Sequence, residues 1–510
     1  MICSVVGVKN RNVTMKKRRK IHIQIIFLIL GLNLSLLGIL LLVFTEQIHD
    51  GIIKTAMKFR EGSTSYNAWL TNNPPLDMDV YLFNWTNPDK ITTPNIKPKF
   101  ERLGPYLFKE CREKINITWN DNNTVSYMHK KLYHFDNERS ARPLEDLITT
   151  VNAVPLTISN KVRYDGFITK TIVSTTLSAL SSINVTVPAG KLLFDGFDDS
   201  ILGILNLASF GEIKDKFGLF YGTNGSQGKD GYYNMYYETD EKFGGISSWN
   251  FKNTSSFYED HCSDIKGSAG EFYPLNRKKD KIIVYSSELC RYAVMEFVEE
   301  VTVKGIKGYK YTGDNIFDNG TSRPENKCFC NGECIPSGVF NVSKCRQGSP
   351  TFLSFPNFYN ADPYYIDLIE GVTPDKERDE FYIVLEPKSG IVIELAARMQ
   401  VNMLLQPIED ISLFDNVPRV FIPIFYFDQK VSIKDHLVTS IKLVQNFPEI
   451  CMTASISILV IGLLGIIGLA INFFFDCKFS RGHPQHPIEQ VKTPAIIEEL
   501  TLNLSKKIEK

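Results

Sequence analysis

The stretch IHIQIIFLILGLNLSLLGILLLVF, residues 21–44, contains no Asp, Glu, Lys or Arg. A bilayer core of about 30 Å needs about 20 helical residues, so this stretch can span it with some tilt. A cleaved signal peptide is the alternative, but its apolar region is about 7 to 15 residues long and ends at a small-residue cleavage site. A second uncharged block, rich in Ile, Leu and Gly, covers residues 450–475. The sequence therefore predicts two transmembrane helices.

Basic residues flank both apolar blocks. Seven of them precede the first block, where residues 1–20 include no acid, and Lys478 and Arg481 follow the second block. Such charges favour a cytosolic location for the flanking segments. We therefore expect cytosolic tails over residues 1–20 and 476–510 and an extracytoplasmic segment over residues 45–449.

The middle segment is rich in glycosylation sequons. Eight Asn-x-Ser/Thr sites lie in it, at Asn84, Asn116, Asn122, Asn184, Asn224, Asn253, Asn319 and Asn341. These sequences are acceptors for N-linked glycans on the surfaces of secreted and lumenal proteins. Their density agrees with the topology predicted from the basic flanks and indicates a glycosylated surface.

Six cysteines cluster in the same segment, at Cys262, Cys290, Cys328, Cys330, Cys334 and Cys345. Six cysteines allow 15 pairings, so spacing alone does not define which residues are joined. A zinc site is the alternative, but the Cys-x-Cys-x3-Cys spacing lacks the C-x2-C pairs of common zinc folds, and the compartment is oxidising. We expect disulfides and no metal or other cofactor. Cys111 is left over, either free or paired between chains.

Strand patterns dominate the middle segment, which contains no internal repeat and no flexible linker. Apolar and polar residues alternate over residues 393–405, which predicts a long half-buried strand. Shorter strands are predicted at residues 80–83, 115–119, 125–135, 282–285, 382–385 and 420–427. The sequence predicts one large β-rich domain.

Helical spacing is confined to about residues 144–208. Leu144, Leu147 and Ile148 have this spacing, and Asp198 or Asp199 can cap a later helix. The middle segment is therefore predicted to be α+β, a β-rich domain with a helical insertion.

Motifs of catalysis are missing from the sequence, which has no G-x-S-x-G, H-E-x-x-H or G-x4-G-K-[ST] pattern. His129 and His134 are five residues apart in a predicted strand, so they face opposite sides of it. An ecto-nucleotidase and a two-span ligand-gated channel are alternatives with the same topology. Their phosphate loops and pore motifs are not found, so we expect a protein that is not an enzyme.

Four groups of residues resemble the class B scavenger receptor family, with an order and spacing that cover residues 21–476. They are YLFNWTN (81–87) with LGPY (103–106), FYEDHC (257–262) with SSELCR (286–291), the cysteine-rich segment from CFC (328–330) to FPNF (355–358), and AARMQVN (396–402). The family includes croquemort-type and other insect receptors and lysosomal integral membrane proteins. The resemblance implies a large antiparallel β-barrel-like ectodomain with an apex of short helices, at about residues 144–208, and an apolar tunnel toward the bilayer.

The resemblance also implies specific residues. The disulfides would be Cys262 to Cys328, Cys290 to Cys345 and Cys330 to Cys334. Basic residues at the apex meet anionic ligands in relatives, and Lys161, Arg163 and Lys170 are the candidates in this chain. The implied ligands are lipoproteins, fatty acids, anionic phospholipids or apoptotic cell surfaces, which the receptor would bind for lipid uptake or transfer.

The two tails carry further expectations. Cys477 lies just inside the second block, a common place for S-palmitoylation, and Cys3 is a second candidate. The tail over residues 478–510 has no acidic dileucine sorting signal, which favours the plasma membrane over the lysosome. Homo-oligomers are consistent with this kind of protein.

Overall fold

The computed structural model describes residues 2–72, 75–210, 213–238, 240–330 and 332–481, with side chains from residue 18 to residue 475. It divides into two compact units, which are described separately. One consists of the two terminal segments, up to Ile48 and from Phe447, and the other is His49–Asn446. Cys3 and Cys477, the predicted lipidation sites, lie outside the described side chains.

Two long helices, α1 (Ile2–Met57) and α8 (Asp435–Arg481), contain the predicted apolar blocks. Both are long and apolar enough to cross a membrane. Each extends beyond its block, because no Pro follows residue 44 in α1, and Pro448 is accommodated inside α8. The prediction of two long apolar helices at the ends of the chain is confirmed.

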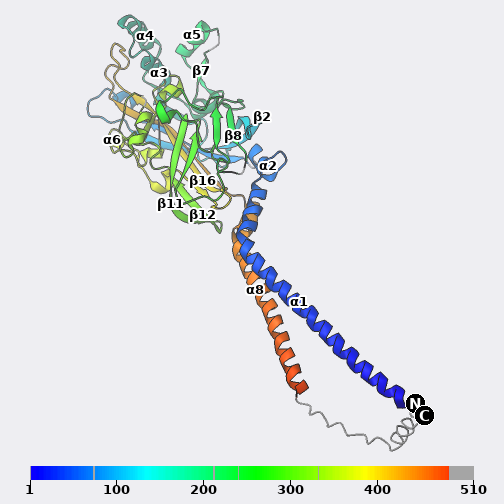
Figure 1. Cartoon of the computed structure of the whole chain (residues 1–510). Coiled ribbons are helices and arrows are strands. Elements are labelled where there is room, and N and C mark those ends of the chain that lie inside the picture. Colours follow the sequence, from blue (N-terminus) through cyan, green and yellow to red (C-terminus); the bar gives the residue numbers. More distant parts are fainter. Residues whose placement is uncertain (1, 73–74, 211–212, 239, 331, 482–510) are drawn as a thin grey trace, which may run out of the picture. The chain divides into compact units, whose positions relative to one another are not determined.

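The second unit, which contains the sheet seen in Figure 1, is built on 13 antiparallel strands. Their order is β10-β11-β12-β15-β16-β17-β1-β2-β3-β8-β9, and in addition β14 pairs with β16 and β13 pairs with β14. The two end strands are nearly joined, since Ser268 bridges to Val284 of β10 and to Gly245 beside β9. The strands are β1 (Leu76–Trp85), β2 (Phe100–Asn120), β3 (Thr124–Phe135), β8 (Tyr233–Tyr236), β9 (Ile246–Trp249), β10 (Lys281–Ser286), β11 (Arg291–Val303), β12 (Ile306–Thr312), β13 (Val339–Asn341), β14 (Thr351–Ser354), β15 (Tyr382–Leu385), β16 (Val392–Leu405) and β17 (Val420–Ser432). The predicted antiparallel, barrel-like β-domain is confirmed.

Strand β16 differs from its prediction in one respect. Its polar residues Arg398, Gln400 and Asn402 are buried, so the strand is covered on both faces. The Gln400 side chain accepts a hydrogen bond from the Asn357 backbone N–H at 2.7 Å and donates one to Asn402 at 2.8 Å, and Asn402 donates to Ser354. The motifs FPNF and AARMQVN are therefore two halves of one buried hydrogen-bonded network.

A helical insertion follows β3. It contains α3 (Ala153–Lys161), α4 (Phe167–Leu180) and α5 (Ser200–Ala208), and the small pairs β4 (Leu147–Val151) with β5 (Asn184–Pro188) and β6 (Phe197–Asp198) with β7 (Lys216–Phe217). The remaining helices are short: α2 (Thr64–Leu70), α6 (Tyr364–Asp367) and α7 (Lys376–Asp379). The helical interpretation of Leu147 and Ile148 was wrong, because the β-branched run that follows them pairs with β5.

Three disulfides tie the cysteine-rich segment together: Cys262 to Cys328, Cys290 to Cys345 and Cys330 to Cys334. These are the pairs that the family resemblance implies. His261 lies beside the first of them, but Cys262 and Cys328 are joined to each other and offer no thiolate to a metal. Cys111 is free and half-buried.

Candidate functional site

Helices α3, α4 and α5 lie at one end of the second unit (Figure 1). Two of these helices, α3 and α5, begin at a side-chain cap, whereas α4 begins after Gly166 without one. Asn152 accepts a hydrogen bond from the Val154 N–H at the start of α3, and Asp199 accepts two, from Ile201 and Leu202, at the start of α5. Asp199 is thus the cap among the two predicted candidates. These caps end the preceding strands and direct the helices outward.

Large apolar side chains are exposed in and beside α4 and α5. The exposed fraction is 68% for Phe167, 76% for Ile168, 79% for Leu207 and 99% for Phe210. We call seven of the exposed residues the apolar tip, namely Tyr164, Phe167, Ile168, Ile172, Ile204, Leu207 and Phe210. Exposed large apolar residues that gather on one part of a protein mark interaction sites, whereas scattered ones carry no such meaning. The apolar tip is therefore a candidate contact surface.

Two of the three predicted basic residues accompany the apolar tip. Lys161 is exposed at the last turn of α3, and the Arg163 guanidinium lies 5.2 Å from the centre of the Tyr164 ring. Lys170 is different, because it is buried and its ammonium group lies 3.0 Å from the Asp410 carboxylate. The expectation that Lys170 presents a charge to ligands is corrected: the side chain ties α4 to the loop that carries Asp410.

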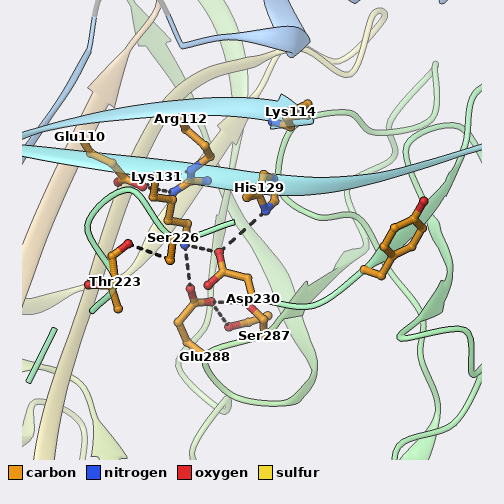
Figure 2. A network of polar contacts seen from close by, with 12 residues as sticks. Glu110, Arg112, Lys114, His129, Lys131, Thr223, Ser226, Asp230, Ser287 and Glu288 are labelled. Atoms are coloured by element: carbon orange, nitrogen blue, oxygen red, sulfur yellow. Dashed lines mark hydrogen bonds and ion pairs between the residues drawn. The ribbon is translucent and has the colours of Figure 1, made fainter. Parts of the chain in front are cut away.

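The inner face of β2 and β3 is charged (Figure 2). Alternation along the two strands places Glu110, Arg112 and Lys114 of β2 on one face, opposite Tyr133, Lys131 and His129 of β3. With Asp230, Glu271 and Glu288 from neighbouring segments, the charged residues of this face form what we call the charged network, which includes His129. The sequence predicted a strand over residues 125–135 but gave no sign that its charged face is the covered one.

Each cation of the charged network has a carboxylate partner. Arg112 contacts Glu110 at 2.8 Å, Lys114 contacts Glu271, and Lys131 contacts both Asp230 and Glu288. Burial would raise the pKa of Glu110, but Arg112 and Lys131 hold it below its ordinary value. Three cations thus face four carboxylates, which leaves the network nearly balanced. Ion pairs in a covered region persist when each charge is compensated in this way.

His129 is the exception in the network. Among the described residues, neither of its ring nitrogens has a hydrogen-bond partner, and Asp230 lies 3.8 Å from Nδ1. Burial lowers the pKa of His129 well below its ordinary value, and the charges of Lys114, Arg112 and Lys131 lower it further. The imidazole is therefore neutral.

Two open pockets lie on the sheet. One, of about 700 Å3, covers β11, β12 and β15 and is lined by charged residues such as Glu299, Lys310 and Glu380. The other, of about 390 Å3, lies beside Cys111 and Lys130 of β2 and β3, and Arg112 of the charged network is also part of its lining. Because both are open and polar in part, they do not match an enclosed apolar passage.

The sequon residues differ in their accessibility. Asn116, Asn122, Asn224 and Asn253 are exposed, and Asn84, Asn184 and Asn341 are half-buried. Asn319 is buried, and its amide nitrogen donates to the carbonyls of Ile335, Pro336 and Val339. A glycan attaches to this same nitrogen, so the folded chain has no room for one at Asn319.

Comparisons with known proteins agree with the fold and the motifs. The CD36 family model matches residues 28–473. The chain is 36% identical to Protein peste of Drosophila melanogaster over 396 residues, which are 76% of this chain and 71% of that protein. It is 30% identical to human Lysosome membrane protein 2, over 81% of this chain and 88% of that protein. It is 29% identical to mouse Scavenger receptor class B member 1, over 78% and 79% respectively. The chain belongs to the CD36 family of class B scavenger receptors.

Proposed function

We propose that this protein is a receptor that binds lipid ligands at its apolar tip and mediates their uptake or transfer, without catalysis. The exposed apolar side chains of α4 and α5 carry the proposal. A fully exposed Leu, Ile or Phe forgoes about 1.5 to 3 kcal/mol that burial would provide. Six such residues in or beside α4 and α5, together with Tyr164, are explained if the tip is buried against a ligand.

The chemistry of the tip favours a lipid surface. Aromatic and aliphatic side chains enter the boundary between headgroups and acyl chains, and basic residues beside them attract anionic headgroups. Lys161 and Arg163 supply the basic component. Lipoproteins, fatty acids, anionic phospholipids and the surfaces of apoptotic cells all present such chemistry.

The proposal is tested on cells that express the full chain. The triple variant Phe167→Ser, Ile168→Ser, Ile172→Ser should bind labelled phosphatidylserine vesicles at least about tenfold less, since losing even part of the burial of three apolar side chains exceeds 1.4 kcal/mol. The matched control is Val298→Ser with Phe251→Ser, because both residues are exposed and lie outside the tip. Unchanged binding by the triple variant at normal surface expression would refute the proposal that ligands bind at the apolar tip.

A second arm addresses charge. The double variant Lys161→Glu, Arg163→Glu should weaken binding to phosphatidylserine vesicles and leave binding to neutral phosphatidylcholine vesicles much less affected. Lys170 is kept unchanged in this arm because its ammonium group is paired with Asp410 inside the fold. Equal effects on both vesicle types would show that the charges act only through the structure of the tip.

The proposed setting is the plasma membrane, with residues 45–449 outside the cell and both tails in the cytosol. The basic flanks support this orientation, and the tail lacks an acidic dileucine signal. We propose glycans on the sequons other than Asn319, and palmitoylation at Cys477, with Cys3 as the second candidate. Protease protection of tagged termini tests the orientation, and surface biotinylation against lysosomal colocalisation tests the location.

A further inference from the structure

Small residues follow one face of α1. Gly31, Ser35, Gly38 and Thr45 are buried, whereas most of the large apolar side chains of the same helix are exposed. Their spacing of four, three and seven residues is that of a face that contacts one other helix. Ser455 and Gly462 are buried on α8 in the same way. We call these six residues the small-residue seam.

The seam brings the two backbones very close together. A Cβ atom added to Gly38 would lie 2.9 Å from the Ser455 carbonyl oxygen, and one added to Gly31 would lie 3.1 Å from the Gly462 carbonyl oxygen. A Cβ added to Gly462 would lie 2.5 Å from Ser35 Oγ. Glycines on both helices are therefore required at reciprocal positions. This reciprocity shows that each helix fits the other.

Two other glycines of α8 provide the contrast. A Cβ added to Gly465 or Gly468 would meet no atom within 4 Å. These residues have the same chemistry and lie in the same apolar block, but they are not at the seam. Close packing is thus confined to the side of α8 that contacts α1.

Polar groups in the seam are also matched. The Thr45 hydroxyl lies 3.5 Å from Cys451 Sγ across the two helices. The hydroxyls of Ser35 and Ser455 donate to the carbonyl oxygens of Gly31 and Cys451, four residues earlier in their own helices. An unsatisfied polar group in hydrocarbon would be costly, and small residues with satisfied hydroxyls are typical of packed transmembrane helices.

We propose that α1 and α8 form an intramolecular helix pair within the membrane, in which the small-residue face of α1 takes α8 of the same chain as its partner. The seam is then occupied in every copy of the protein. Association between copies must use other surfaces, and the face formed by Gly31, Ser35 and Gly38 is not available for it.

The test uses the native Cys451. Thr45→Cys places a second thiol opposite it, and Phe44→Cys is the matched control, because Phe44 is the neighbouring residue and is 48% exposed. A protease site is inserted after Asn137, which is exposed and lies outside the segment closed by the three disulfides. Full-length protein in membranes is oxidised mildly, cleaved, and separated on a denaturing gel without reductant.

The expected result is that the Thr45→Cys chain keeps its full-length mass after cleavage, whereas the Phe44→Cys chain separates into two fragments. Adding Gly38→Ile should abolish the link, and adding Gly468→Ile should leave it intact. A band at twice the mass, formed through Thr45→Cys, would show that the seam joins two copies and would overturn the proposal. Absence of any link in Thr45→Cys protein at normal surface level would overturn it as well. If Gly38→Ile fails to reach the surface, the comparison of Thr45→Cys with Phe44→Cys still tests whether α1 and α8 of one chain are paired.

Discussion

Replacing His129 with phenylalanine should make the second unit less sensitive to acid. The imidazole is 7% exposed and packs against the rings of Tyr127 and Tyr233, with centroid distances of 5.4 and 5.1 Å. Burial and the charges of Lys114, Arg112 and Lys131 lower the pKa of this group well below 6.5, its value in an unfolded chain. The folded chain therefore holds the imidazole neutral, and the unfolded chain does not.

The direction and size of the effect follow from proton linkage. Below pH 6.5 the unfolded imidazole gains a proton that the folded one does not, so the free energy of unfolding falls as the pH falls. If the folded imidazole stays neutral throughout, the loss between pH 7 and pH 5 is about 2 kcal/mol, at 1.36 kcal/mol per pH unit below the unfolded pKa. Phenylalanine does not titrate, so the His129→Phe variant should not lose this part of the unfolding free energy between pH 7 and pH 5.

The assay is denaturant unfolding of the full chain in detergent, followed by tryptophan fluorescence at pH 7 and pH 5. The quantity compared is the change in unfolding free energy between the two pH values, so a uniform effect of the larger ring on fit cancels. His134→Phe is the matched control, because His134 lies on the same strand with its side chain exposed. Equal acid losses in the wild type and in His129→Phe would refute the argument that burial and the neighbouring cations lower the pKa of His129 and keep it neutral.

Three further changes test other parts of the structure. Asn319→Ala should lower the free energy of unfolding by about 2 to 3 kcal/mol, because three backbone carbonyls lose their donor, and should leave the gel mobility unchanged. Asn253→Gln should instead increase mobility by one glycan, and a mobility shift with Asn319→Ala would contradict the burial argument. Lys170→Glu should destabilise the fold by about 3 kcal/mol or more, measured as thermal unfolding, because it places two carboxylates together at Asp410, and normal stability would show that the pair is dispensable. Gln400→Leu should cost about 1 to 3 kcal/mol in the same measurement, since it leaves the buried Asn357 N–H without an acceptor, and a neutral result would show that water or a shifted backbone replaces the amide.

The sequence predicted those elements whose signal is local. Uncharged runs of more than 20 residues define α1 and α8, and period-two alternation placed β16 within one residue of its observed bounds. The cap at Asp199 was also among the two residues predicted from the sequence, since an acid before an apolar helix is a short-range signal. In each case the physical cause acts between neighbours in the chain.

The errors concern what covers a segment. Alternation in β16 predicted one solvated face, but Gln400 and Asn402 are buried beneath a segment about 45 residues away in the chain. Lys170 was grouped with exposed cations because its partner, Asp410, is 240 residues distant. Spacing within a strand or helix says which residues share a face. It does not say what lies on that face, because that depends on contacts made by distant segments.

Whether a face is covered by distant segments or exposed to solvent also distinguishes the two notable surfaces of this protein, the charged network and the apolar tip. The charged network places cations and carboxylates on a covered face, where every cation has a carboxylate partner, so its composition is accounted for by the fold. The apolar tip places Phe167, Ile168 and Phe210 in water, where nothing in the described chain covers them. Folding gains nothing from that exposure, and solubility is reduced by it. A feature that the fold does not need has to be explained by something outside it, and this is the reason why we propose the apolar tip as the ligand-binding surface.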